Sequence, residues 1–497
     1  MVPGTAASPT RQTGLLMPVS SLPGRHGIGD FGASTVTFLK SIKKAGFALW
    51  QILPLTPIGY GHSPYQPYSS LAMDEIYISL DALYTAGLLK SVPSYRERSV
   101  RVNFEKVRAF KNRYLHKAFK VALKKNPRLG AQLKKRMANY YEYAVFMAFK
   151  KAFDNRLWNE WDEGERNWIR DRELDLSNYE AEIVYQLFLQ DILKKQWTAL
   201  KNKAHALGLQ IIGDLPFYVG HDSVECYANQ EYFFLDRRGN PLLISGVGPD
   251  YFSKTGQRWG NPIYNFSALK EHKYRFLIER IKECGDIYDF IRLDHFRAFD
   301  TYYVIDAKEK TAERGEWKLG PSYEFFDLLF EEFDARRIIA EDLGDIRPEV
   351  ITLRDHYEFP GMDVMQFEIL SDKVKVANPN NVYYVGTHDN DTLKGWYLKL
   401  NKPERAKLHQ LLAFEGLEGD VYEQMMKYAL ARPNRLAILF MGDILKQSNV
   451  ARINKPGIID DINWTYRLQS LRPFKEKVPF LKGLIEESNR ATCPKLD

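Results

Sequence analysis

Eight short apolar runs, most of which end in or just before polar residues, constrain the fold of this chain more than any other feature. Amphipathic stretches separate most of the runs, which occupy residues 14–19, 48–53, 209–214, 289–294, 337–341, 363–367, 382–385 and 436–440. Apolar strands that alternate with helices indicate a parallel sheet buried on both faces. Eight such units favour a closed (β/α)₈ barrel over an open doubly wound sheet, although a short apolar run is also compatible with a buried helix.

The spacing of the runs is uneven and predicts two insertions into the barrel. Residues 57–207 are rich in Lys, Glu and aromatic residues at helical spacing, so we expect a mainly helical subdomain there. Residues 219–267 are dense in Gly, Pro, Tyr and Trp, and we expect a loop region. We therefore divide the chain into an N-terminal tail at 1–13 and a barrel at 14–497 whose insertions lie on the C-terminal, catalytic face. A loop and then a closing helix are expected after residue 449.

Composition limits the compartment and the partners. The net charge of +7 is mild for 497 residues, and stretches such as 117–136 read as solvated helix faces rather than a nucleic-acid footprint. Three cysteines far apart in the sequence favour a reducing compartment. The N-terminus has no signal-peptide pattern, and no apolar run approaches the roughly 20 residues that span a bilayer. We expect a cytoplasmic protein with no nucleic-acid or membrane partner, as a monomer or weak homodimer.

Two carboxyl groups at predicted strand ends suit glycosidic bond cleavage, in which one group attacks or activates water and the other protonates the leaving oxygen. Asp294 ends the run 289–294, and Arg292 lies on the same face of that strand. A neighbouring arginine favours the ionised carboxylate that a nucleophile requires. Glu341 ends an apolar run, where its pKa can be raised as an acid catalyst requires. The simpler alternatives are an ion pair for Asp294 and a helix cap for Glu341.

Two further predicted strand ends carry polar residues. His388 and Asp389 follow the seventh run; the imidazole can bond a sugar hydroxyl, and the carboxylate can support an oxocarbenium-like transition state. The residues at 388–391 could also bind a hard cation, although their composition makes that a weak signal. Asp214 ends the third run and adds a fourth carboxylate. Because barrel active sites lie at the C-terminal strand ends, we expect these groups to converge.

The order Asp214, Arg292-x-Asp294, Glu341, His388-Asp389 resembles the α-amylase clan of retaining glucan enzymes. More narrowly, the chain resembles the amylomaltase or disproportionating-enzyme family, the 4-α-glucanotransferases. The motifs that carry this resemblance are SSLPG at 20–24, GIGD at 27–30, WQILPL at 50–55, SPYQ at 63–66, PDYF at 249–252, GQRWGNP at 256–262 and AEDLG at 340–344. They extend over nearly the whole chain.

The resemblance implies a role for each matching residue. Asp294 would form a covalent glucosyl-enzyme, Glu341 would act as general acid and base, and Asp389 would stabilise the transition state. The implied glucan-binding residues are Tyr60, Ser63, Tyr65, Asp214, Asp250, Trp259, Asn261, Arg292 and His388. The expected substrates are maltooligosaccharides and starch- or glycogen-type α-1,4-glucans, and no metal or cofactor is expected.

Three other activities remain open at this point: a hydrolase of the same clan, a silent glucan-binding protein, and a metal-dependent barrel enzyme. The chain also departs from the family pattern at His62, at 73–75, and at Asp363, Gly442 and Ile458. None of these positions belongs to the catalytic three. We therefore expect the departures to affect donor contacts, acceptor preference and glucan length rather than the type of reaction.

Overall fold

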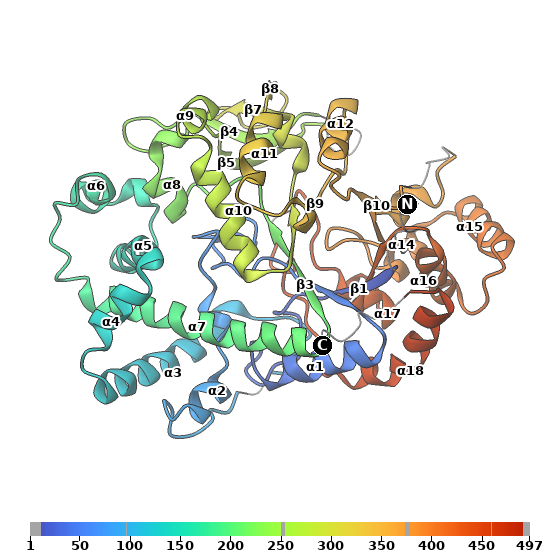
Figure 1. The fold of residues 1–497 in the computed structure, drawn as a ribbon, viewed down its shortest axis with the longest axis horizontal. Coiled ribbons are helices and arrows are strands. Elements are labelled where there is room, and N and C mark those ends of the chain that lie inside the picture. Colours follow the sequence, from blue (N-terminus) through green and yellow to red (C-terminus); the bar gives the residue numbers. More distant parts are fainter. Residues whose placement is uncertain (1–10, 96, 250–253, 373–377, 459, 491–497) are drawn as a thin grey trace, which may run out of the picture.

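The structure is a computed structural model that describes residues 11–95, 97–249, 254–372, 378–458 and 460–490, with Tyr60 described only in its backbone. Eight parallel strands form its central sheet (Figure 1). In spatial order they are β10 (Met362–Val364), β11 (Val382–Tyr384), β12 (Leu436–Phe440), β1 (Gln12–Leu16), β2 (Leu49–Gln51), β3 (Gln210–Leu215), β6 (Phe290–Leu293) and β9 (Ile338–Ala340).

The sheet curls into a nearly closed barrel. Its outer strands β9 and β10 approach each other, since the Ala340 amide donates to the Pro360 carbonyl at 2.8 Å and the Met362 amide donates to the Asp342 carboxylate at 2.8 Å. The predicted (β/α)₈ barrel is thereby confirmed. The first strand begins at Gln12, inside the stretch expected to be a tail.

One predicted strand is wrong in its second half. The run 363–367 forms β10 only to Val364 and then turns into the short helix α13 (Met365–Glu368). A short apolar run is compatible with both a strand and a buried helix, so the sequence could not predict where the strand ends and the helix begins. By contrast, β12 matches its prediction over all five residues; its last four residues are buried, as a strand covered on both faces requires.

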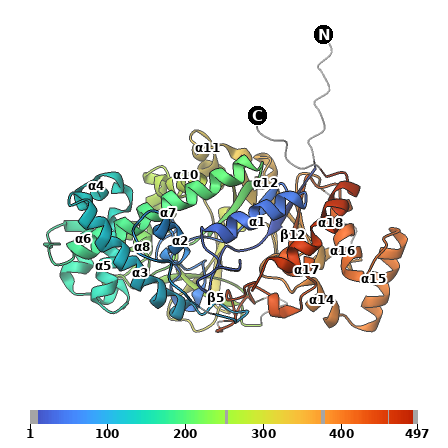
Figure 2. The same cartoon turned by 90° about the horizontal axis from the view of Figure 1, so that it is seen from below.

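The segment between β2 and β3 is mainly helical and forms one side of the molecule (Figures 1 and 2). Its helices are α2 (Leu80–Thr85), α3 (Phe104–Lys125), α4 (Leu129–Arg136), α5 (Tyr141–Ala152), α6 (Glu163–Asp171) and α7 (Glu180–Ala206). Asn103 caps α3 by accepting from the Lys106 amide at 2.9 Å. Ion pairs join α3 to the barrel loops: Arg108 Nη2 lies 2.8 Å from Asp74, and Lys111 Nζ lies 3.2 Å from Asp30.

The segment 219–267, expected to be loop-like, also contains regular structure. Besides α8 (Val224–Ala228), it supplies β4 (Leu243–Val247) and β5 (Gln257–Pro262) to an antiparallel sheet with β7 (Thr301–Asp306) and β8 (Gly315–Leu319). Strand β4 pairs with β7 in the register Ile244 to Ile305. The partner strand lies some sixty residues further along the chain, so local sequence gives little sign of this pairing.

The remaining helices cover the barrel or connect its strands. They are α1 (Ala33–Lys44), α9 (Phe266–Glu271), α10 (Arg275–Ile287), α11 (Ser322–Phe330), α12 (Pro348–His356), α14 (Leu393–Lys399), α15 (Lys402–Phe414), α16 (Val421–Ala431), α17 (Met441–Ile444) and α18 (Arg472–Glu487). The expected closing helix is α18, which packs against α1. Within the described ranges, no helix is long and apolar enough to span a bilayer.

Candidate active site

An arginine joins two carboxylates across the ends of β3 and β6. Asp214 and Arg292 are register partners on these strands, so their side chains lie on the same face of the sheet. Arg292 Nη1 donates to both Asp214 oxygens at 2.9 Å and to Asp294 Oδ1 at 2.8 Å. Burial raises the pKa of Asp214, and the arginine opposes that rise. The structure therefore brings together the Asp214, Arg292 and Asp294 side chains that the sequence predicted to converge.

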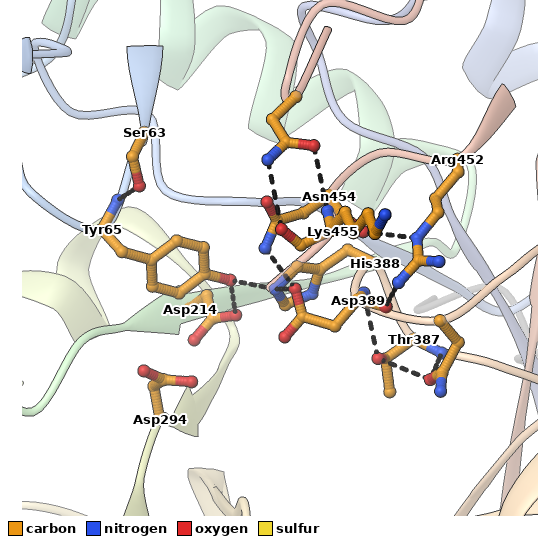
Figure 3. Close-up of polar contacts among 12 residues, drawn as sticks. Ser63, Tyr65, Asp214, Asp294, Thr387, His388, Asp389, Arg452, Asn454 and Lys455 are labelled. Atoms are coloured by element: carbon orange, nitrogen blue, oxygen red, sulfur yellow. Dashed lines mark hydrogen bonds and ion pairs between the residues drawn. The ribbon is translucent and has the colours of Figure 1, made fainter. Parts of the chain in front are cut away.

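Tyr65 and His388 extend this group from two other loops (Figure 3). The Tyr65 hydroxyl donates to Asp214 Oδ2 at 2.8 Å and lies 3.0 Å from His388 Nε2. The two rings stack with their centroids 5.3 Å apart, and His388 Nε2 lies 3.4 Å from Asp389 Oδ1. A continuous chain of polar contacts therefore joins Asp294 to Asp389.

A segment near the C-terminus holds Asp389, and the sequence pattern gave it no role. Asn454 Nδ2 donates to Asp389 Oδ1 at 2.7 Å, and its backbone amide donates to the His388 carbonyl at 3.0 Å (Figure 3). Arg452 Nη2 donates to the Asp389 carbonyl at 2.6 Å. The only signal in the sequence was the Asn454–Gly457 stretch itself, which reads as an ordinary turn.

Glu341, which directly follows β9, has different surroundings. Its Oε2 accepts from the His295 amide at 2.7 Å and its Oε1 from the Leu343 amide at 3.2 Å. Among the described residues, no cationic side chain donates to this carboxyl. Burial raises the pKa of Glu341 to about 8, an effect that Arg292 opposes and Asp294 reinforces. A carboxyl of this kind carries a proton at neutral pH and can deliver it to a leaving group.

His295 is a second residue that the sequence pattern did not single out. It follows Asp294 directly and has a left-handed backbone with φ 52°, which aims its amide at Glu341. Its ring meets the Trp259 ring edge-on, with centroids 4.9 Å apart. Burial lowers the pKa of His295 to about 4, so the ring is neutral at ordinary pH. The local sequence could not predict the left-handed backbone of His295, because the neighbouring strands hold the residue in that conformation.

The other predicted binding residues are less closely grouped. Ser63 Oγ accepts from the Tyr65 amide at 3.3 Å, and Gln66 Nε2 donates to the Trp259 carbonyl at 3.0 Å, which joins the 63–66 loop to β5. Asn261 is buried, and its amide is bonded to the Val219 carbonyl and the Ser245 hydroxyl. Asp250 and the side chain of Tyr60 lie outside the described residues.

Two of the family departures face the helical insertion. The His62 ring stacks on Phe104 of α3, with centroids 5.0 Å apart. Asp74 is buried and bonded to Arg108 of the same helix.

The other departures lie elsewhere in the barrel and its loops. Asp363 accepts from Asn381 at 3.0 Å and from Asn434 at 3.1 Å. Gly442 is buried, whereas Ile458 is 42% exposed. In the described part of the chain, no three His, Cys, Asp or Glu side chains are grouped so that they could hold a metal ion.

Known proteins resemble this chain over almost its whole length. A family model described as 4-alpha-glucanotransferase matches residues 17–472. A 4-alpha-glucanotransferase from Thermus thermophilus is 37% identical over 97% of this chain and 99% of the relative. One from Synechocystis is 38% identical over 92% and 94%. The solved structure of the amylomaltase from Streptococcus agalactiae in complex with acarbose has a TM-score of 0.91 at 33% identity, and covers 97% of this chain and 100% of that one.

Proposed function

This chain belongs to the 4-alpha-glucanotransferase family and is a 4-α-glucanotransferase, and we propose that Asp294, Glu341 and Asp389 perform its reaction. The enzyme transfers a segment of a (1→4)-α-D-glucan to the 4-hydroxyl of an acceptor glucose or glucan. The observation that carries the proposal is the difference between two carboxyl groups at neighbouring strand ends. Asp294 is paired with an arginine at 2.8 Å, whereas burial raises the pKa of Glu341 to about 8.

The first step cleaves the donor chain. Asp294 attacks the anomeric carbon, the bond from that carbon to the glycosidic oxygen breaks, and Glu341 gives its proton to the departing oxygen. The products are a free shortened glucan and a glucan segment whose reducing-end glucosyl residue is bonded covalently to Asp294. The Asp389 carboxylate supports the positive charge that develops on the ring, and its bond from Asn454 fixes its orientation.

The second step uses the same groups in reverse. Glu341, now ionised, takes the proton of the acceptor 4-hydroxyl while that oxygen attacks the anomeric carbon and displaces Asp294. The two inversions restore the α configuration. The proton taken from the acceptor returns Glu341 to its starting, protonated state. The hydrogen bonds from the His295 and Leu343 amides favour the ionised Glu341 that this step requires.

The substrate contacts follow from the same arrangement. Around the cleavage point, we assign the sugar-binding side chains to Tyr65, Asp214, Arg292 and His388. Acceptor contacts would come from Trp259 and Asp250, and further contacts from Tyr60, Ser63 and Asn261. The substrates would be maltooligosaccharides and starch- or glycogen-type α-1,4-glucans, and the enzyme would act in the cytoplasm as a monomer or weak homodimer.

The products from maltotriose test this function. A transferase should convert maltotriose alone into glucose and a ladder of longer oligomers, because a sugar hydroxyl resolves the intermediate. Glucose and maltose without longer chains would instead indicate the related hydrolase. Chromatography of the products over time separates the two outcomes. A protein that binds glucan but forms no product would instead support the interpretation as a silent glucan-binding protein.

A further inference from the structure

Positive charge is concentrated in one stretch of the helical insertion. Between residues 106 and 141 the chain has twelve Lys and Arg and no Asp or Glu, whereas the whole chain has a net charge of +7. The rest of the molecule is therefore acidic by five charges. A charge asymmetry of this size within one subdomain is a feature that commonly accompanies an anionic partner.

The structure separates these twelve residues into two groups. Four form ion pairs with acids: Arg108, Lys111, Lys134 and Arg136. The other eight are exposed, and within the described ranges none of them has an acidic partner within ion-pair distance. We name these eight the basic face; it consists of Lys106, Arg113, Lys117, Lys120, Lys124, Lys125, Arg128 and Lys135.

Five members of the basic face form a line along α3. Lys106, Arg113, Lys117, Lys120 and Lys124 are spaced by seven, four, three and four residues, which places them on one side of a helix. At about 1.5 Å per residue the line is about 27 Å long. Such a row can neutralise an anionic group at any point along its length.

This line begins beside the loop that carries Tyr65, in the proposed active site, and runs away from it. Phe104, the first residue of α3, stacks on His62 in the loop that carries Tyr65. Just before the helix, the Val102 amide donates to the Thr465 carbonyl at 2.6 Å, next to Trp464, whose ring lies 5.5 Å from that of Tyr65. The helix then extends into the outer part of the insertion (Figure 2). A glucan chain bound at the active site can therefore continue along α3.

The side chains of the basic face indicate which class of molecule it can bind. None of the exposed large apolar side chains of the described protein lies between residues 104 and 136. A helix that inserts into a lipid surface presents apolar residues beside its cations, and single-stranded nucleic acid is usually held by aromatic stacking as well as by charge. A row of cations alone suits phosphate groups on an otherwise polar chain.

We propose that the basic face binds phosphate monoesters carried by the glucan substrate, and so favours phosphorylated over neutral glucan polymers. The inference rests on the proposed function, because one glucan chain must occupy the active site and the basic face at once. Each phosphate along the row would meet two or three cations, and the tethered chain would raise the local concentration of glucan ends at the active site.

The test uses one starch-type glucan in two forms, before and after removal of its phosphate groups by a phosphatase. We expect KM to be about three- to tenfold lower for the phosphorylated form, as one or two exposed ion pairs would give. The preference should shrink between 50 and 300 mM salt because the charges are exposed. The triple variant Arg113→Glu, Lys120→Glu and Lys124→Glu should lose it, and glutamate preserves the helix propensity of these positions.

A matched control carries the same change of charge elsewhere. Lys40→Glu, Lys310→Glu and Lys475→Glu alter exposed lysines that have no acidic partner among the described residues, and this variant should keep the preference.

Equal KM values for the two glucans in the native enzyme would overturn the proposal, as would a preference that survives in the α3 variant. Tight binding of an oligonucleotide or of anionic vesicles with no preference between the glucans would also overturn it. Maltotriose turnover should be unchanged throughout; its absence in the native enzyme would count against the proposed function instead.

Discussion

Asp294 and Glu341 stand at the ends of adjacent strands, β6 and β9, yet their carboxyl groups meet different partners. Asp294 contacts a buried arginine that Asp214 shares, and its side chain is 28% exposed. Glu341 has two backbone amides in place of a cation, and burial raises its pKa to about 8. One barrel edge therefore supplies an ion-paired carboxylate and a protonated carboxyl, the division of roles that a retaining mechanism needs.

The largest effect expected from this comparison is the loss of the proposed nucleophile, Asp294. Asp294→Asn should lower maltotriose turnover by at least about 10⁴-fold, because an amide cannot form the covalent intermediate. Glucan affinity, measured by calorimetry, should persist because Arg292 and its partners remain in place. Substantial residual turnover would assign the nucleophile to another carboxylate.

Replacing the other carboxyl tests the second half of the comparison. Glu341→Gln should slow transfer from maltotriose by about 10²- to 10⁴-fold, since no proton reaches the leaving oxygen. A donor that leaves without a proton, such as α-glucosyl fluoride, should restore the first step and let the glucosyl-enzyme accumulate in mass spectra. Asp294→Asn should show no such rescue, and an equal response of the two variants would remove the distinction between the sites.

Loss of the hydrogen bond from Asn454 to Asp389 should lower the activity by a smaller factor. Asn454→Ala removes a hydrogen bond to an ionised group and should lower kcat by about 10- to 100-fold. Asn463→Ala is the control, because its amide bonds the Lys455 and Ile458 carbonyls in the same segment without touching Asp389. If the two variants lose the same activity, the effect belongs to the segment and not to the bond.

The pH profile compares the two sites in the native enzyme. Since the raised pKa of about 8 belongs to Glu341, kcat/KM should stay high through neutral pH and fall above about pH 8, by about tenfold per pH unit. Initial rates with dilute maltotriose between pH 5 and 10 measure this limb. A limb near pH 5 would mean that Glu341 is ionised in the free enzyme.

The smallest expected effect is on stability. The folded protein keeps the Glu341 proton up to about pH 8, whereas an unfolded glutamate releases it near 4.5. The folded state therefore binds more protons between these values, and stability falls as the pH rises through that window. Glu341→Gln removes this dependence and should gain on the order of 1–3 kcal/mol relative to the native enzyme at pH 8, but little at pH 4.5. Urea unfolding at both values measures the difference, and equal gains would contradict the raised pKa.

Much of the fold was predictable because most barrel strands lie in buried apolar runs that lead into polar residues. The run at 436–440 became β12 without any change of bounds, and the family resemblance of the motifs is confirmed by the comparisons. The sheet formed by β4, β5, β7 and β8 was not predictable in the same way. Its partners are distant in sequence, and strand pairing leaves little local signal.

The sequence by itself determined which chemical groups are present and at which strand ends they lie. The alternation of side chains along a strand is enough to place Arg292 and Asp294 on one face of β6. Only the tertiary structure decided what surrounds each carboxyl. The left-handed backbone of His295 and the approach of Asn454 to Asp389 depend on segments that are distant in the chain or held by neighbouring strands. Burial and hydrogen bonding set the protonation state of Glu341, and both are properties of packing, which exists only once the chain is folded.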